Sequence, residues 1–119
     1  DVRTEAEYAA GHPAGALNVP VMLAAGGRMV PNADFEAVVQ AHFGNDAKLV
    51  VGCKMGSRSM RAIGQLQALG YENLVDLRPG WSGARNAFGK LTEEGWEAAG
   101  LPSELVTAGG SYAELAPRG

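Results

Sequence analysis

Cysteine and histidine are scarce in this chain. Its 119 residues include one cysteine, Cys53, and two histidines, His12 and His42, which lie far apart in the sequence. A single cysteine excludes a disulfide within the chain, and no set of residues has the ligand spacing of a zinc site. We therefore expect no metal site. We also expect a free thiol at Cys53, which suits a reducing compartment and makes the cytoplasm the expected location.

The chain also lacks a strong charge of either sign and a long apolar run. Its formal net charge is −3, from 10 basic and 13 acidic residues. Such a charge gives no reason to expect binding to nucleic acid. No apolar run approaches the roughly 18 residues of a membrane span, and there is no signal-peptide pattern. We therefore expect no nucleic-acid partner and no membrane association.

The chain opens with Asp1-Val2-Arg3 and has no initiator methionine. These residues precede Thr4 and Glu7, whose spacing is that of a capping box at the start of a helix. The opening tripeptide therefore reads as the end of a strand. We expect the first strand of the sheet to lie ahead of Asp1, outside the given sequence, where an organellar or export signal would also have room.

Apolar periodicity and turn residues divide the rest of the chain into short elements. They predict helices over residues 4–10, 35–43 and 58–69, and strands over residues 17–20, 48–52 and 74–77. Residues 23–33 are predicted as a loop, and residues 82–100 as helix in two pieces. Residues 103–119 are predicted as a C-terminal tail, with Tyr112 and Leu115 docking onto the body.

Strands that alternate with helices are typical of the α/β class. We predict a doubly wound, mainly parallel sheet flanked by helices, formed by residues 1–102 as one domain. In such sheets, functional sites lie at the carboxyl ends of the strands. Cys53 occupies such an end, directly after the strand over residues 48–52.

The loop after this strand carries the chemistry. Cys53 is followed, before and into the next helix, by Lys54, Met55, Gly56, Ser57, Arg58 and Ser59. A helix N-terminus and nearby cations favour a thiolate and a bound anion. Glycine lets backbone N–H groups converge on one anion, and serine hydroxyls add donors. We therefore predict a reactive thiol in an anion-binding loop, in preference to a small buried apolar residue.

Several motifs, in order along the chain, resemble those of the single-domain rhodanese sulfurtransferases. They are Asp1-Val2-Arg3, Glu7-Tyr8, Gly11-His12, Gly15-Ala16-Leu17-Asn18-Val19-Pro20, Cys53-x-x-Gly56-x-Arg58-Ser59 and Gly80-Trp81. The sequence departs from the family pattern at Pro13, where the usual proline comes one place later, and at Pro79, where the family has glycine. Residues 86–97 look like additional sequence.

This resemblance implies sulfur transfer. Cys53 would attack the outer sulfur of a donor such as thiosulfate, carry that sulfur as a persulfide, and pass it to cyanide or a thiol. Because the sulfur is carried covalently, no cofactor is expected. The residues expected to bind substrate are Lys54, Met55, Gly56, Ser57, Arg58 and Ser59. The alternative is a persulfide-relay or binding module that acts on a partner protein, with little thiosulfate turnover of its own.

A cysteine phosphatase is the second alternative, and loop length argues against it. Such enzymes place five residues between the cysteine and the arginine, whereas four separate Cys53 from Arg58. The tighter ring suits a single sulfur atom. Outside the loop we predict structural roles: an ion pair for Asp1 and Arg3, a turn-stabilising hydrogen bond for His12, and core packing for Trp81 and Trp96.

Overall fold

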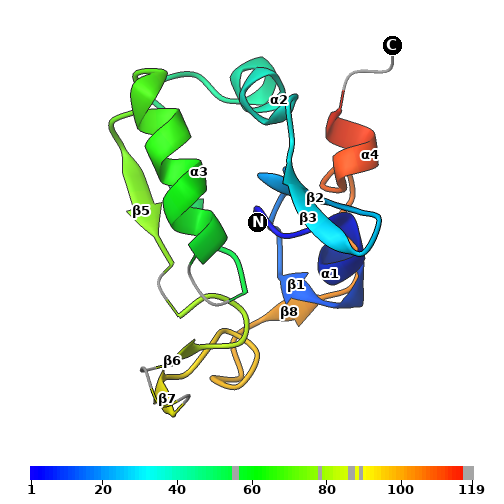
Figure 1. The fold of residues 1–119 in the computed structure, drawn as a ribbon, viewed down its shortest axis with the longest axis vertical. Helices are drawn as coiled ribbons and strands as arrows, with labels where there is room; N and C mark the ends of the chain where they lie inside the picture. Colours follow the sequence, from blue (N-terminus) through cyan, green and yellow to red (C-terminus); the bar gives the residue numbers. More distant parts are fainter. Residues whose placement is uncertain (55–56, 78, 86–87, 89, 117–119) are drawn as a thin grey trace.

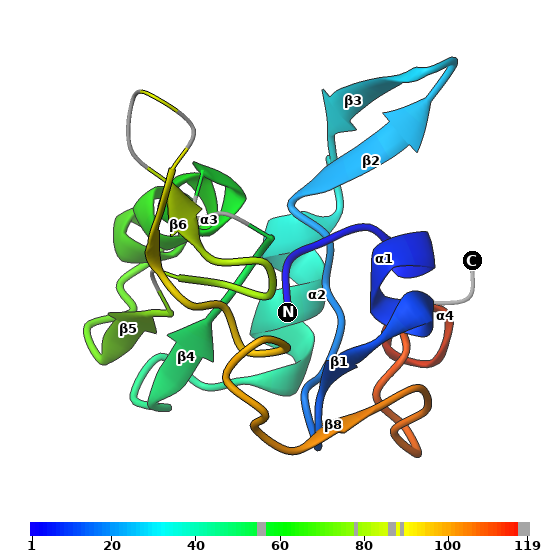
Figure 2. The same cartoon turned by 90° about the horizontal axis from the view of Figure 1, so that it is seen from below.

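The computed structural model describes residues 1–54, 57–77, 79–85, 88 and 90–116. Figures 1 and 2 show its elements from two sides. In chain order they are α1 (Glu5–Ala10), β1 (His12–Pro13), β2 (Met22–Ala25), β3 (Arg28–Pro31), α2 (Phe35–His42), β4 (Leu49–Val51), α3 (Ser57–Ala68), β5 (Leu74–Asp76), β6 (Ala84–Arg85), β7 (Leu91–Glu93), β8 (Ser103–Glu104) and α4 (Tyr112–Leu115).

A parallel pair, β4 and β5, forms the centre of the fold, with Val50 opposite Val75. Residues 1–3 extend this layer, because the N–H of Val2 donates to the carbonyl of Gly52 at 2.9 Å. The next segment lies beside them, where the N–H of Val19 donates to the carbonyl of Asp1 at 3.0 Å. The layer therefore agrees with the predicted α/β fold. The predicted strand over residues 17–20 is an extended segment outside the regular ladders.

The core lies between this layer and helices α2 and α3. Buried side chains from the three elements meet there: Phe35, Val38, Val39, Val51, Ala62 and Leu66. Helix α3 follows its prediction closely, except that Met60 is 70% exposed. A three-residue step turns back by about 60° on a helix. Met60 is the first of four apolar residues spaced three apart, with Ile63, Leu66 and Leu69, and it therefore lies at one edge of the apolar stripe that they form around the helix.

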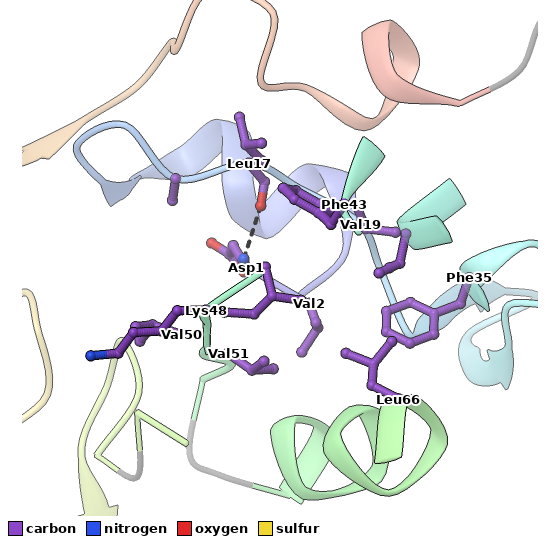
Figure 3. Close-up of a pocket in the computed structure, with 13 residues that line it drawn as sticks. Asp1, Val2, Leu17, Val19, Phe35, Phe43, Lys48, Val50, Val51 and Leu66 are labelled. Carbon is purple, nitrogen blue, oxygen red and sulfur yellow. Dashed lines mark hydrogen bonds between the residues drawn. The ribbon is translucent and has the colours of Figure 1, made fainter. Parts of the chain in front are cut away.

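A cavity of about 200 Å³ lies beside β4, at the edge away from β5. Figure 3 shows Leu17 and Val19 on one side of it, Val50 on the other, and Phe35 and Leu66 pointing into it. Val50 is 59% exposed, which is unusual for a valine in the middle of a parallel layer.

The segment predicted as a loop over residues 23–33 is largely a β-hairpin. Strands β2 and β3 pair antiparallel, with Ala25 opposite Arg28. Gly26 and Gly27 form the connection with φ values of 57° and 80°. Two adjacent residues with positive φ give the turn twist that two-residue hairpins favour. The Gly-Gly pair was therefore a hairpin signal, which the prediction overlooked.

The helices predicted over residues 82–100 are wrong for the described part of that range. Strands β6 and β7 pair antiparallel there, and turns follow as far as Gly100. Backbone packs tightly against backbone, because a Cβ on Gly95 would lie 2.3 Å from the carbonyl oxygen of Trp81. Such close approach needs glycine and disfavours a regular helix. Gly89, one of the predicted breaks, lies outside the described residues.

The C-terminal segment contacts the body at both of its elements. Strand β8 pairs antiparallel with β1, with Glu104 opposite His12. Helix α4 begins with a capping box and buries Leu115, so the predicted docking of that side chain is confirmed. The amide of Asn32 donates to the Tyr112 hydroxyl at 3.1 Å. Within the described residues, no helix is long and apolar enough to span a membrane.

Truncating Leu115 tests whether this docking contributes to stability. We expect Leu115→Ala to lower the free energy of unfolding by about 2–3 kcal/mol, because it removes buried methyl groups and leaves a cavity. Leu105→Ala is the matched control, since Leu105 is 64% exposed, and its effect should stay within about 0.5 kcal/mol. Chemical denaturation measures both. Equal effects of the two substitutions would contradict the docking.

Candidate active site

Cys53 follows β4 after one residue, Gly52, at the carboxyl end of the parallel pair, and only 2% of it is exposed. Its thiol lies 3.6 Å from the hydroxyl of Ser59, which is fully buried in the first turn of α3. The sequence placed both residues in one loop, and the structure brings their side chains together. A buried thiol beside a hydroxyl and a helix N-terminus has partners that stabilise negative charge on sulfur.

The other residues predicted to bind substrate differ in their placement. Lys54 is exposed, and Ser57 begins α3. Met55 and Gly56 lie outside the described residues, so the predicted convergence of their N–H groups stays a prediction. Arg58 is half-buried, and its guanidinium contacts a residue from a different helix.

Arg58 forms a two-point ion pair with Glu7 of α1. Its Nη1 donates to Oε1 at 2.6 Å, and its Nη2 donates to Oε2 at 2.9 Å. These hydrogen bonds from Arg58 are the main reason that the pKa of Glu7 falls to about 2 from an ordinary 4.5. The same bonds raise the pKa of Arg58, and the nearby Cys53 adds to that rise. Sequence reasoning identified Glu7 as a capping residue and as part of the Glu7-Tyr8 motif, but it missed the contact of Glu7 with Arg58.

The segment after β5 fixes the backbone of the cysteine loop. The N–H of Trp81 donates to the carbonyl of Cys53 at 2.8 Å, and the N–H of Ser82 donates to that of Lys54 at 2.9 Å. Gly80 makes this approach possible, with a φ of 59°. A Cβ there would lie 2.3 Å from the carbonyl oxygen of Cys53. The Gly80-Trp81 motif therefore has a structural reason, which is support of the loop.

Arg3 and Asp1 form the predicted ion pair, and it is buried. The Nη2 of Arg3 donates to Oδ2 of Asp1 at 2.7 Å and to the carbonyl of Gly11 at 2.7 Å. The guanidinium also lies over the ring of Trp81, 5.0 Å from its centroid. Burial is the main cause that lowers the pKa of Arg3. Both charged groups of this pair therefore have close partners, as burial requires.

Trp81 and Trp96 were predicted to pack in the core, but they line a cavity beside the cysteine. The cavity measures about 370 Å³, and Cys53, Arg3, Trp81 and Trp96 contribute to its wall. Both tryptophans are half-buried. This cavity and the smaller one in Figure 3 share Val50, so both flank the same edge of β4. Sequence spacing gave no signal for this, because Trp96 comes from a turn that the helical prediction misassigned.

His12 is fully buried and bridges two segments. Its Nδ1 lies 2.8 Å from the carbonyl of Tyr8, and its Nε2 lies 2.7 Å from the hydroxyl of Thr107. The predicted hydrogen bond of His12 is therefore present. Among the described residues, no group of three histidine, cysteine, aspartate or glutamate side chains could hold a metal ion.

Substitution of Gly80 tests the support of the loop. We expect Gly80→Ala to lower the free energy of unfolding by about 2 kcal/mol or more, because the new Cβ collides with the Cys53 carbonyl at a positive φ. The control is Gly64→Ala on α3, where a Cβ meets nothing within 4 Å. It should stabilise the protein by up to about 1 kcal/mol. Denaturant unfolding compares them, and a neutral Gly80→Ala would show that the loop does not depend on this contact.

Comparison with known proteins agrees with this site. A family model described as the Rhodanese-like domain matches residues 1–87. The chain is 36% identical over 104 residues to thiosulfate sulfurtransferase 16, chloroplastic, of Arabidopsis thaliana, covering 87% of this chain and 77% of that protein. It is also 36% identical over 95 residues to the thiosulfate:glutathione sulfurtransferase of Homo sapiens, covering 78% of this chain and 74% of that protein.

A solved structure has the same fold. The crystal structure of Rv0390 from M. tuberculosis matches with a TM-score of 0.70 and 26% identity, covering 89% of this chain and 82% of that chain. The chain spans only 44% of the length of two further plant relatives. Since the family model covers well over half of the chain, and the cysteine loop and its support fall within that match, the chain belongs to the rhodanese-like family and has its fold.

Proposed function

We propose that the protein is a sulfurtransferase that moves a sulfane sulfur through a persulfide on Cys53. The observation that carries this proposal is the position of Cys53, buried at the carboxyl end of β4 and beside the first turn of α3. A thiol in this position is both nucleophilic and able to carry a charged sulfur. The side chains that would support it are those of the loop, including Lys54 and Ser59.

The first half-reaction loads the cysteine. The thiolate of Cys53 attacks the outer sulfur of a donor such as thiosulfate and forms a new S–S bond with it. The bond between the two donor sulfurs breaks, and sulfite leaves with the electron pair. The terminal sulfur of the resulting persulfide is anionic. We infer that the N-terminal turn of α3 and the loop amides of residues 54–58 stabilise it, with Met55, Gly56 and Ser57 in the roles that the sequence predicted. Arg58 contributes through its backbone amide, because its guanidinium is paired with Glu7.

The second half-reaction discharges the persulfide. Cyanide or an acceptor thiolate attacks the terminal sulfur, and the Cys53 thiolate leaves with the electron pair of the broken S–S bond. The products are thiocyanate or an acceptor persulfide. The cycle moves one sulfur atom with no net oxidation or reduction, so the loop and the substrates together supply everything that the chemistry needs.

The names of the relatives support this class of reaction. One relative is named for thiosulfate, and another for thiosulfate and glutathione. Those names describe those proteins, and they make thiosulfate and a low-molecular-weight thiol the first substrates to test here. We place the reaction in the cytoplasm, because a lone reactive thiol suits a reducing compartment. The Arabidopsis relative is named as chloroplastic.

A persulfide relay to a partner protein is the second candidate. Met60 favours it, because this side chain is 70% exposed on α3, close in sequence to the cysteine loop. An exposed apolar side chain near a reactive group provides a contact for an acceptor protein. The two candidates share the loading step and differ in the acceptor that discharges the persulfide.

Intact-protein mass spectrometry after incubation with thiosulfate tests the loading step. We expect the natural chain to gain the mass of one sulfur atom, and Cys53→Ala to gain nothing. Addition of cyanide should remove the extra mass. No adduct on the natural chain would contradict the proposed function. Loading followed by slow discharge to cyanide and fast discharge to a protein thiol would select the relay.

A further inference from the structure

We propose that Glu7 is a specificity-determining residue of the Cys53 site: it neutralises Arg58 and so weakens the attraction of the site for highly charged anions. This inference rests on the proposed function, since it concerns the donors that reach Cys53. Arg58 was expected from the sequence to offer its charge to the substrate. Its guanidinium instead lies on the carboxylate of Glu7, at 2.6 and 2.9 Å.

The carboxylate of Glu7 is held in place from both sides. Its Oε1 also accepts from the backbone N–H of Thr4 at 3.2 Å and from the Thr4 hydroxyl at 3.0 Å. The first of these bonds belongs to the capping box that starts α1. Both side chains of the ion pair are largely covered, with 16% of Arg58 and 27% of Glu7 exposed. The pair is therefore a fixed contact between α1 and the first turn of α3, and it is better shielded from solvent than a surface salt bridge.

The ion pair between Glu7 and Arg58 reduces the electrostatic attraction that the site exerts on an incoming anion. A lone guanidinium attracts an anion as a full charge, whereas a guanidinium paired with a carboxylate acts as a dipole whose field falls off faster. Arg3, a second arginine that lines the cavity beside Cys53, is likewise paired with Asp1. Lys54 is exposed, so water and salt screen its charge. The described side chains around Cys53 therefore present little net positive charge.

Glu7→Gln removes the carboxylate charge with little change in shape. Glutamine at the third helical position also satisfies a capping box, so the start of α1 is kept. The variant leaves the charge of Arg58 in place and removes its counterion. The matched control is Glu5→Gln, which makes the same charge change on the exposed side of α1.

The rates at which two reagents of similar size alkylate Cys53 report the local electrostatic field. Iodoacetate carries a negative charge and iodoacetamide is neutral. In both reactions the thiolate forms an S–C bond and iodide leaves with the electron pair. The ratio of the two rate constants reports the attraction of the site for an anion, because changes in thiol ionisation affect both rates alike. The measurement needs no sulfur donor, so it is independent of whether the protein transfers sulfur.

We expect Glu7→Gln to raise the iodoacetate-to-iodoacetamide ratio about three- to tenfold at low salt, and this gain to shrink in 0.5 M salt. Glu5→Gln should leave the ratio within about twofold of the natural chain, since its charge is screened. Adding Arg58→Gln to Glu7→Gln should abolish the gain. Under the proposed function, Glu7→Gln should also lower the KM for thiosulfate more than its kcat changes.

Two results would overturn the inference. One is a ratio in Glu7→Gln that equals the ratio in Glu5→Gln, and the other is a gain that survives Arg58→Gln. Near-UV circular dichroism establishes that each variant is folded. If Glu7→Gln does not fold, the inference is tested instead on Lys54→Gln, by the salt dependence of its iodoacetate-to-iodoacetamide ratio. A change below about twofold between 0.02 and 0.5 M salt supports a neutralised Arg58, and a steep fall refutes it.

Discussion

Two backbone hydrogen bonds hold the site together, from Trp81 and Ser82 to the carbonyls of Cys53 and Lys54. They fix the start of the cysteine loop against the segment that follows β5. Without these two bonds, the loop backbone at Cys53 and Lys54 would lose its contact with the segment after β5. Gly80 permits the contact, because any Cβ there would collide with the loop. The chemistry proposed for Cys53 depends on this support, since a nucleophile must be held in place to react efficiently.

Charge pairing is the second constraint on the site. Among the described residues, two arginines lie near the cysteine, and each contacts a carboxylate of its own: Arg3 with Asp1, and Arg58 with Glu7. The first pair is almost fully buried, where an unpaired charge would be costly. The second joins α1 to α3 across the site. Positive charge near a thiol is commonly assigned to substrate binding. Here the charges of Arg3 and Arg58 form ion pairs within the protein that stabilise the fold around the site.

Local patterns in the sequence predicted helices α1, α2 and α3 well. The spacing of Thr4 and Glu7 predicted the capping box of α1, because both partners lie within one helical turn. The pairing of Glu7 with Arg58 joins residues 51 positions apart, and no local pattern specifies such a contact. The hairpin at Gly26 and Gly27 was missed for a different reason. Its turn signal was present, but the flanking strands are half-exposed and lack a clear alternation of apolar residues.

The central claim is that Cys53 carries sulfur as a covalent intermediate, and sulfite release tests it most directly. Protein mixed with excess thiosulfate and no acceptor should release one sulfite per chain in a rapid burst and then stop. Cyanide added after removal of the thiosulfate should yield one thiocyanate per chain. Sulfite release without a burst, or a burst that persists in Cys53→Ala, would contradict the account.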